Sequence, residues 1–95
     1  MRLETKEIEA LAEKLNLSKE EMLRESLKSF LGKKLREIKT EIFRMGTRYG
    51  VYTVEEFEEL YKKGEIEEKD TWQDLQKLDH LEFKREELEK ILKAL

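Results

Sequence analysis

Residues 18–45 decide the fold; they read SKEEMLRESLKSFLGKKLREIKTEIFRM, and their apolar side chains recur at helical spacing throughout. Ser18 and Glu21 have the spacing of a capping box, in which each side chain bonds a backbone N–H of the other residue. Leu17 and Met22 flank that box at the positions of a hydrophobic staple. The sequence therefore predicts one long helix over this stretch, on the order of 40 Å at ~1.5 Å per residue.

The second half of this helix carries a heptad seam. From Leu31 onward the apolar residues follow alternating steps of four and three, a spacing suited to packing along another helix. Gly32 interrupts the seam at about 1 kcal/mol relative to alanine, so a break there is the alternative to one continuous helix. We expect the seam to form an oligomer interface through Leu31, Leu35, Ile38 and Ile42.

A shorter helix is predicted before the long one, over residues 6–15, with an apolar stripe on one face. Thr5 is the predicted N-cap, because its hydroxyl can accept a bond from a free amide of the first turn. Asn16 stands where a left-handed residue would end this helix, a conformation that asparagine tolerates. Residues 1–4 are the one segment with any likeness to a strand.

The same boundary pattern recurs in the second half of the chain. Residues 46–50, GTRYG, predict a loop, after which Thr53 and Glu56 form a second capping box. A helix over residues 54–63 follows, and Gly64 is placed to end it.

The last predicted helix begins near WQDLQKL and continues toward residue 95, because no proline or glycine interrupts it. Asp70 or Thr71 is the expected N-cap. Apolar residues in the first turns of this helix share one face, and we expect them to contact a protein partner: Trp72, Leu75, Leu78 and Leu81.

Composition supports a folded chain. Charged residues make up 45% of the 95 residues and apolar residues 38%, but 20 basic and 23 acidic residues nearly cancel to −3. We predict an all-α fold in a single helical domain, residues 1–95, with a long central helix, shorter helices and a long C-terminal helix. Residues 5–46 would self-associate and residues 53–95 would bind a partner. Because a copy this small buries little surface, we expect a dimeric helical bundle.

Several classes of function are disfavoured by the residues. The chain has no cysteine, which excludes thiolate metal sites and disulfides. His80 is the only histidine, and with Asp79 and Glu82 it would need further ligands from elsewhere to hold a metal. No apolar run reaches ~18 residues, so we expect no membrane span and a cytoplasmic location. We predict no enzyme activity and no cofactor.

The many Glu and Lys residues are typical of a protein from a thermophile.

A basic block lies in the long helix. Residues 28–48 hold seven basic and two acidic residues, whereas residues 53–70 hold three basic and eight acidic residues. An acidic protein partner, or the acidic segment of a second copy, would fit the block as well as nucleic acid does. If nucleic acid is bound, the expected phosphate contacts are Lys33, Lys34, Arg36 and Lys39.

Aromatic residues cluster around the junction of the last two helices and form either a small core or a partner-anchoring patch, of which we favour the core. Phe43 and Phe83 fall off the main seams and indicate a second interface. The aromatic residues of the cluster are Tyr49, Tyr52, Phe57, Tyr61 and Trp72.

Residues 5–31, TKEIEALAEKLNLSKEEMLRESLKSFL, resemble the helix-turn-helix part of the ribbon–helix–helix repressor family. That family often supplies the DNA-binding half of antitoxins, so the resemblance implies dimerisation and contact with operator DNA. Only MRLE precedes this stretch, and most of the ribbon strand of that family is therefore missing.

Residues 48–92, RYGVYTVEEFEELYKKGEIEEKDTWQDLQKLDHLEFKREELEKIL, resemble small archaeal antitoxin-like proteins. The resemblance implies a helical, oligomeric protein that binds a toxin and performs no catalysis. The alternative is a structural or scaffolding helical oligomer with no nucleic-acid contact.

Overall fold

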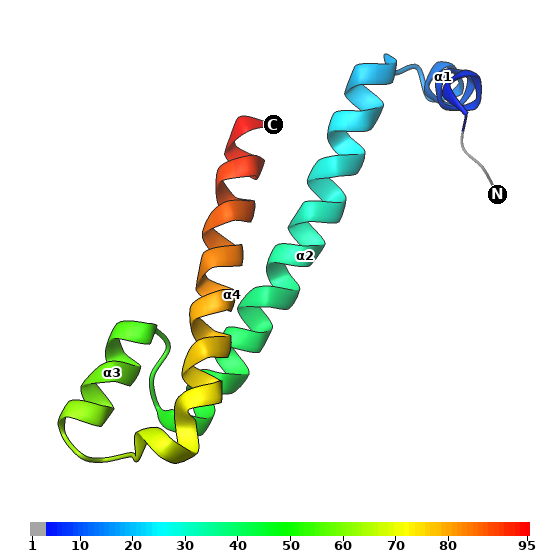
Figure 1. Ribbon diagram of the computed structural model, residues 1–95. Helices are drawn as coiled ribbons and strands as arrows, with labels where there is room; N and C mark the ends of the chain where they lie inside the picture. Colours follow the sequence, from blue (N-terminus) through cyan, green and yellow to red (C-terminus); the bar gives the residue numbers. More distant parts are fainter. Residues whose placement is uncertain (1–3) are drawn as a thin grey trace.

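A computed structural model describes residues 4–95, which form four α-helices and no strand. The helices are α1 (Thr5–Lys14), α2 (Lys19–Tyr49), α3 (Val54–Lys62) and α4 (Glu68–Ala94). Helices α2 and α4 lie side by side and antiparallel, α3 packs against one end of this hairpin, and α1 lies at the far end of α2 (Figure 1). The predicted all-α class, with a long central and a long C-terminal helix, is confirmed.

Helix α2 begins as predicted but ends later. The Ser18 hydroxyl oxygen accepts a hydrogen bond from the Glu21 backbone amide at 3.0 Å, and the helix passes Gly32 without a break. The loop predicted over residues 46–50 is wrong, because α2 continues to Tyr49 and ends at Gly50, which has φ 73°. Tyr49 packs its ring against Phe57, and this tertiary contact holds the last helical turn in place.

Helix α1 ends as predicted but starts differently. Asn16 has φ 58°, the left-handed conformation expected after the helix. The prediction of Thr5 as N-cap is wrong: Glu4 holds that position with extended backbone, and its carbonyl accepts bonds from the amides of Glu7 and Ile8. The likeness to a strand over residues 1–4 lies, except for Glu4, outside the described residues.

Helix α3 begins at Val54 as predicted and ends at Lys62, one residue before the predicted end. The Thr53 hydroxyl oxygen accepts a bond from the Glu56 amide at 3.0 Å, and Gly64 follows the helix with φ 72°. Both features are local, since each depends on residues within one helical turn.

Helix α4 begins three residues before Thr71, so the prediction that Asp70 or Thr71 caps it is wrong. Glu67 is the N-cap, without a side-chain bond. The Thr71 hydroxyl instead donates to the Glu67 carbonyl at 2.8 Å and lies 2.7 Å from the hydroxyl oxygen of Tyr61. Thr71 is therefore a buried contact between α3 and α4.

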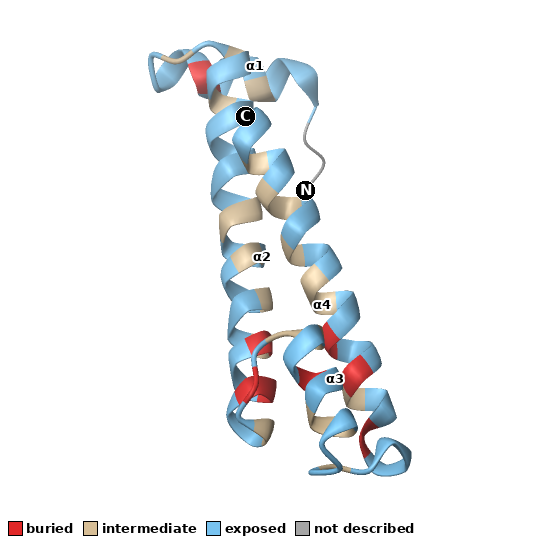
Figure 2. Ribbon diagram, turned by 90° about the vertical axis from the view of Figure 1, so that its left-hand side faces the viewer, coloured by how far each residue is buried: buried red, intermediate tan, exposed pale blue. Residues whose placement is uncertain are grey.

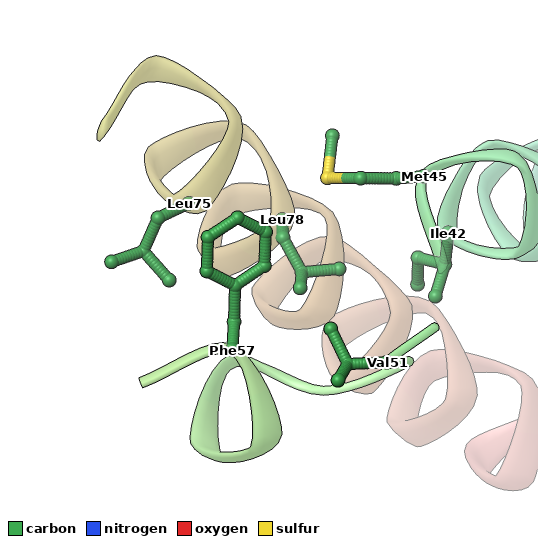
Figure 3. Packing of buried hydrophobic residues seen from close by; sticks show 6 residues of the cluster. All are labelled: Ile42, Met45, Val51, Phe57, Leu75 and Leu78. Carbon is green, nitrogen blue, oxygen red and sulfur yellow. The ribbon is translucent and has the colours of Figure 1, made fainter. Parts of the chain in front are cut away.

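The hydrophobic core lies at the α3 end of the hairpin. Phe57 projects from α3 between Leu75 and Leu78 of α4, and Val51 of the preceding loop belongs to the same cluster (Figure 3). Most of the remaining length of the hairpin is only half-buried or exposed (Figure 2). The buried cluster consists of Ile42, Met45, Val51, Phe57, Leu75 and Leu78.

The molecule is elongated. Its principal extents are 61 × 27 × 17 Å and its radius of gyration is 19.6 Å, where a compact chain of this length would have about 12 Å. Its accessible surface is 7584 Å², against about 5,800 Å² for a compact monomer of 11.5 kDa. Two helices side by side cannot enclose a core along their whole length, and the open length leaves apolar side chains in contact with solvent.

Candidate protein-interaction surfaces

Polar contacts fix the end of the hairpin where α2, α3 and α4 meet. The Tyr49 hydroxyl donates to Asp74 of α4, and the Arg48 guanidinium lies 3.3 Å from the same carboxylate. Burial, together with the hydrogen bond and the negative charge of Asp74, raises the pKa of Tyr49. The Val54 amide donates to Glu82 at 3.0 Å, so α4 also holds the start of α3. These contacts determine which faces of α4 stay accessible.

The seam predicted as an oligomer interface contributes to the core of a single chain. Ile42 is 6% exposed and belongs to the buried cluster, and Ile38 packs against that cluster. Leu31 and Leu35, farther from α3, are half-buried. Only this far end of the seam therefore retains apolar surface that a second chain can contact.

The residues predicted to contact a protein partner are divided between core and surface. Leu75 and Leu78 belong to the buried cluster, and Leu81 is half-buried against it. Trp72 points outward and is 46% exposed. It lines a groove of about 300 Å³ whose other lining residues are Val54, Glu58, Leu75, Gln76 and Asp79.

Phe83 extends the exposed surface at Trp72. The two residues are eleven positions apart, about three helical turns, and therefore lie on the same side of α4. Phe83 is 63% exposed and lines a shallow groove with Glu86, Glu87 and Lys90. We name the surface formed by Trp72, Phe83 and their neighbours Glu58, Asp79, Glu86 and Glu87 the outer α4 face.

The aromatic cluster predicted as a core is half core and half surface. Phe57 is fully buried and makes edge-to-face contacts with Tyr49 and Tyr61, at centroid distances of 4.7 and 5.6 Å. Trp72 and Tyr52 are exposed instead. Tyr52 stacks on Phe43 at 5.9 Å, and the two rings line a groove that reaches the core residue Ile42.

The four residues predicted to contact phosphate do not form one cluster. Lys33 and Arg36 line a groove of about 660 Å³ on α2 that also contains two carboxylates. Lys34 forms an ion pair with Glu37 at 3.4 Å, and Lys39 pairs with Glu89 of α4 at 3.9 Å. The positive charge of this block is therefore partly neutralised within the chain.

A further surface lies at the end of the molecule opposite α3. Helix α4 stops short of the first turns of α2 (Figure 1), and residues 5–30, which hold α1, the turn after it and these first turns, extend beyond its end. We name this part the projecting arm. A groove of about 670 Å³ lies between α2 and the turn that joins it to α1, where Leu15 and Leu17 line it. The arm holds five of the ten exposed large apolar side chains of residues 4–95: Leu11, Leu15, Leu23, Leu27 and Phe30.

The sequence predictions include the arm within the self-associating residues 5–46 and within the stretch that resembles the ribbon–helix–helix family, but they assign no interface residue before Leu31. The apolar periodicity of the long helix begins well before Leu31, over residues that the heptad seam does not use. The periodicity alone does not tell which part of α2 lies beyond the reach of α4.

Residues 4–95 contain no group of three or more His, Asp or Glu side chains placed to hold a metal ion. None of the four helices is long and apolar enough to cross a membrane.

Comparison with curated proteins and with solved structures gave no match. A family model described as the uncharacterized protein MJ0235 family matches residues 1–95. Because the match covers the whole sequence given, the chain belongs to the MJ0235 family.

Proposed function

We propose that this protein is a non-catalytic binding protein of the cytoplasm that self-associates through one end and holds a protein partner at the other. An antitoxin-like role is the specific form of this proposal, with a toxin as the partner. The observation that carries it is the large accessible surface of the chain, on which apolar side chains remain exposed at two separate places.

The solvent-accessible surface of the chain is large enough to contain protein–protein interfaces. The chain exposes about 1,800 Å² more than a compact monomer of its mass. A stable protein–protein interface of standard size buries about 800 Å² on each partner. The surplus is therefore large enough for two interfaces, one on the projecting arm and one on the outer α4 face.

The outer α4 face has the composition of a partner-binding surface. Exposed Trp and Phe are typical anchors of protein interfaces, because they bury a large area at a small entropic cost. Four carboxylates and one lysine surround Trp72 and Phe83. Charge complementarity then favours a partner that presents apolar pockets within a basic surface.

Trp72 provides the experiment, because it is the only tryptophan in the chain. The protein encoded by the adjacent reading frame is co-expressed and titrated while the Trp72 emission is followed. We expect a blue shift on binding and at least a tenfold weaker complex for W72A and F83A. The matched control is Q73A, which changes an exposed residue next to Trp72 on another side of α4. Unchanged affinity in both W72A and F83A contradicts the assignment of this face.

The second candidate is a scaffolding oligomer with no nucleic-acid contact, which the ion pairs of Lys34 and Lys39 favour. A gel shift on short duplex DNA separates it from a protein that also binds an operator. Binding at about 50 mM salt that is lost with rising salt, and lost in K33A/R36A, would support the DNA-binding form. No retardation at that salt supports the scaffold.

A further inference from the structure

One stripe of the projecting arm combines exposed apolar residues with a regular helical spacing. Leu23, Leu27 and Phe30 follow steps of four and three, so they share one side of α2. Their exposed fractions are 40%, 47% and 57%. Residues spaced in this way at the end of a helix that α4 does not reach form a seam without a partner in the same chain.

The charges at the two ends of this stripe are opposite. Glu20 lies seven residues before Leu27 and Lys34 lies seven residues after it, so both continue the stripe by one heptad. Both side chains are exposed. Lys34 pairs with Glu37 and lies 5.5 Å from the centroid of the Phe30 ring, and exposed contacts of this kind are weak enough to be exchanged.

We propose that two copies of this chain pair through the stripe, with their α2 helices antiparallel and Leu27 on the two-fold axis. In that register Leu23 of each copy lies opposite Leu31 of the other. The Arg24 guanidinium lies opposite the Phe30 ring, where a cation–π contact is favourable. Glu20 lies opposite Lys34, and the two-fold axis repeats this ion pair at the other end of the interface.

The residues of the stripe are complementary to the same residues read in the opposite direction from Leu27. This self-complementarity identifies a second copy of the chain as the binding partner of the stripe. A two-fold interface must be self-complementary, so each residue has to suit the residue at the mirrored position of the same sequence. In the antiparallel register around Leu27, a leucine lies opposite a leucine, an acidic residue lies opposite a basic one, and an arginine lies opposite an aromatic ring. A different partner would give no reason for this symmetry.

The exposed surface of the projecting arm is large enough for an interface between the arms of two copies. Leu11 of α1 and Leu15, which directly follows α1, add to the exposed apolar surface at the same end of the molecule. About 800 Å² per copy would suffice for a stable interface, which is well within the surplus surface of the chain. The interface differs from the one expected from the heptad seam: it keeps Leu31 and replaces Leu35, Ile38 and Ile42 by the arm residues.

This inference rests on the proposed self-association, but it can fail separately from it. If the protein dimerises through another surface, the arm assignment is wrong, while self-association and partner binding at the outer α4 face still stand. If the protein is a monomer, both the arm assignment and the self-association are wrong. Binding at the outer α4 face is then measured independently with the Trp72 variants.

The first test is disulfide trapping, which is clean because the chain has no cysteine of its own. In L27C the two new thiols meet at the axis, and mild oxidation is expected to make the covalent dimer the main species. The control is S29C, whose side chain lies about 200° around the helix from Leu27 and should remain monomeric. Absence of the L27C dimer, or equal trapping in S29C, would overturn the proposal.

The second test uses charge reversal and does not depend on the packing at the axis. E20K and K34E each place like charges opposite one another and should weaken the dimer about five- to tenfold, measured by sedimentation equilibrium. The double variant E20K/K34E should recover the wild-type affinity. E25K is the control, because it makes the same charge change at a residue that is outside the stripe. A double variant weaker than either single variant would overturn the antiparallel register.

Discussion

The backbone amide of Val54 donates a hydrogen bond to the Glu82 carboxylate at 3.0 Å, so α4 caps the first turn of α3 from a distance of 28 residues. This contact joins α3 to the helix whose outer face carries Trp72 and Phe83. It also satisfies one of the amides that the start of a helix leaves without an intrahelical partner.

Loss of this cap should be measurable. Glu82→Ala is expected to lower the free energy of unfolding by about 1–2 kcal/mol, because a partly buried amide loses its acceptor. Glu82→Gln retains a carbonyl oxygen and should recover much of that loss. The matched control is Glu86→Ala, one helical turn along, where the side chain is exposed. Equal effects at Glu82 and Glu86 in urea denaturation would contradict the capping role.

Two glycines of α2 should respond oppositely to the same substitution. A Cβ at Gly46 would lie 2.7 Å from the Val51 carbonyl oxygen and closer still to the Tyr52 ring. A Cβ at Gly32 would lie 3.9 Å from its nearest neighbour, an atom of Arg36. Gly46→Ala should therefore destabilise the protein by about 1–3 kcal/mol. Gly32→Ala should stabilise it by about 0.5–1 kcal/mol, because alanine is the better helix former.

Urea midpoints of the two glycine variants provide the measurement. The comparison is internally matched, since both substitutions add one methyl group to the same helix. A stabilising effect of Gly46→Ala would mean that Tyr52 does not cross α2 at this point.

The contribution of side-chain packing to the free energy of unfolding should decrease along the hairpin with distance from α3. Leu78 is 1% exposed, whereas Leu92 near the end of α4 is only half-buried. Leu78→Ala is expected to cost about 3–5 kcal/mol and Leu92→Ala clearly less, because the cost of truncation depends on the cavity left behind. Similar losses of unfolding free energy at both positions, in thermal or urea unfolding, would show that side chains are packed equally well along the whole hairpin and would contradict this prediction.

Tyr49 should make stability sensitive to alkaline pH. Its pKa is raised in the folded chain, first by burial and then by the hydrogen bond and charge of Asp74. The stabilisation is therefore fully present below the unfolded-state pKa of about 10 and is lost as pH rises through the raised folded-state pKa.

The unfolding midpoint of the wild type should consequently fall more steeply above about pH 10 than that of Tyr49→Phe, which cannot ionise. Other tyrosines and lysines titrate in the same range, and the Phe variant corrects for them because it retains them all. An identical alkaline slope in the two proteins would contradict the raised pKa.

Helix boundaries set by local chemistry could be predicted from the sequence. The hydroxyls of Ser18 and Thr53 accept bonds from amides within the next turn. Asn16 and Gly64 adopt the left-handed conformation, which asparagine tolerates and which glycine adopts readily because it has no Cβ. Boundaries set by tertiary contacts could not. Helix α2 continues to Tyr49 because this ring packs on Phe57, which the residues of GTRYG do not indicate.

The interaction surfaces were only partly predictable for a related reason. Periodicity shows that a helix has an apolar side but not which chain covers it. Ile42, Leu75 and Leu78 lie in the core of one copy, while Leu27, which carries the same pattern, is exposed on the projecting arm. The difference arises from the relative lengths and register of α2 and α4, which only the folded arrangement reveals.

The most direct test of self-association is the molar mass of the purified chain of residues 1–95 in solution, measured by light scattering at micromolar concentration. We predict twice the chain mass of 11.5 kDa for the wild type, and a shift toward the single-chain mass when Leu27 is replaced by lysine. A wild-type mass of one chain would contradict the claim that the exposed apolar surface is covered by a second copy.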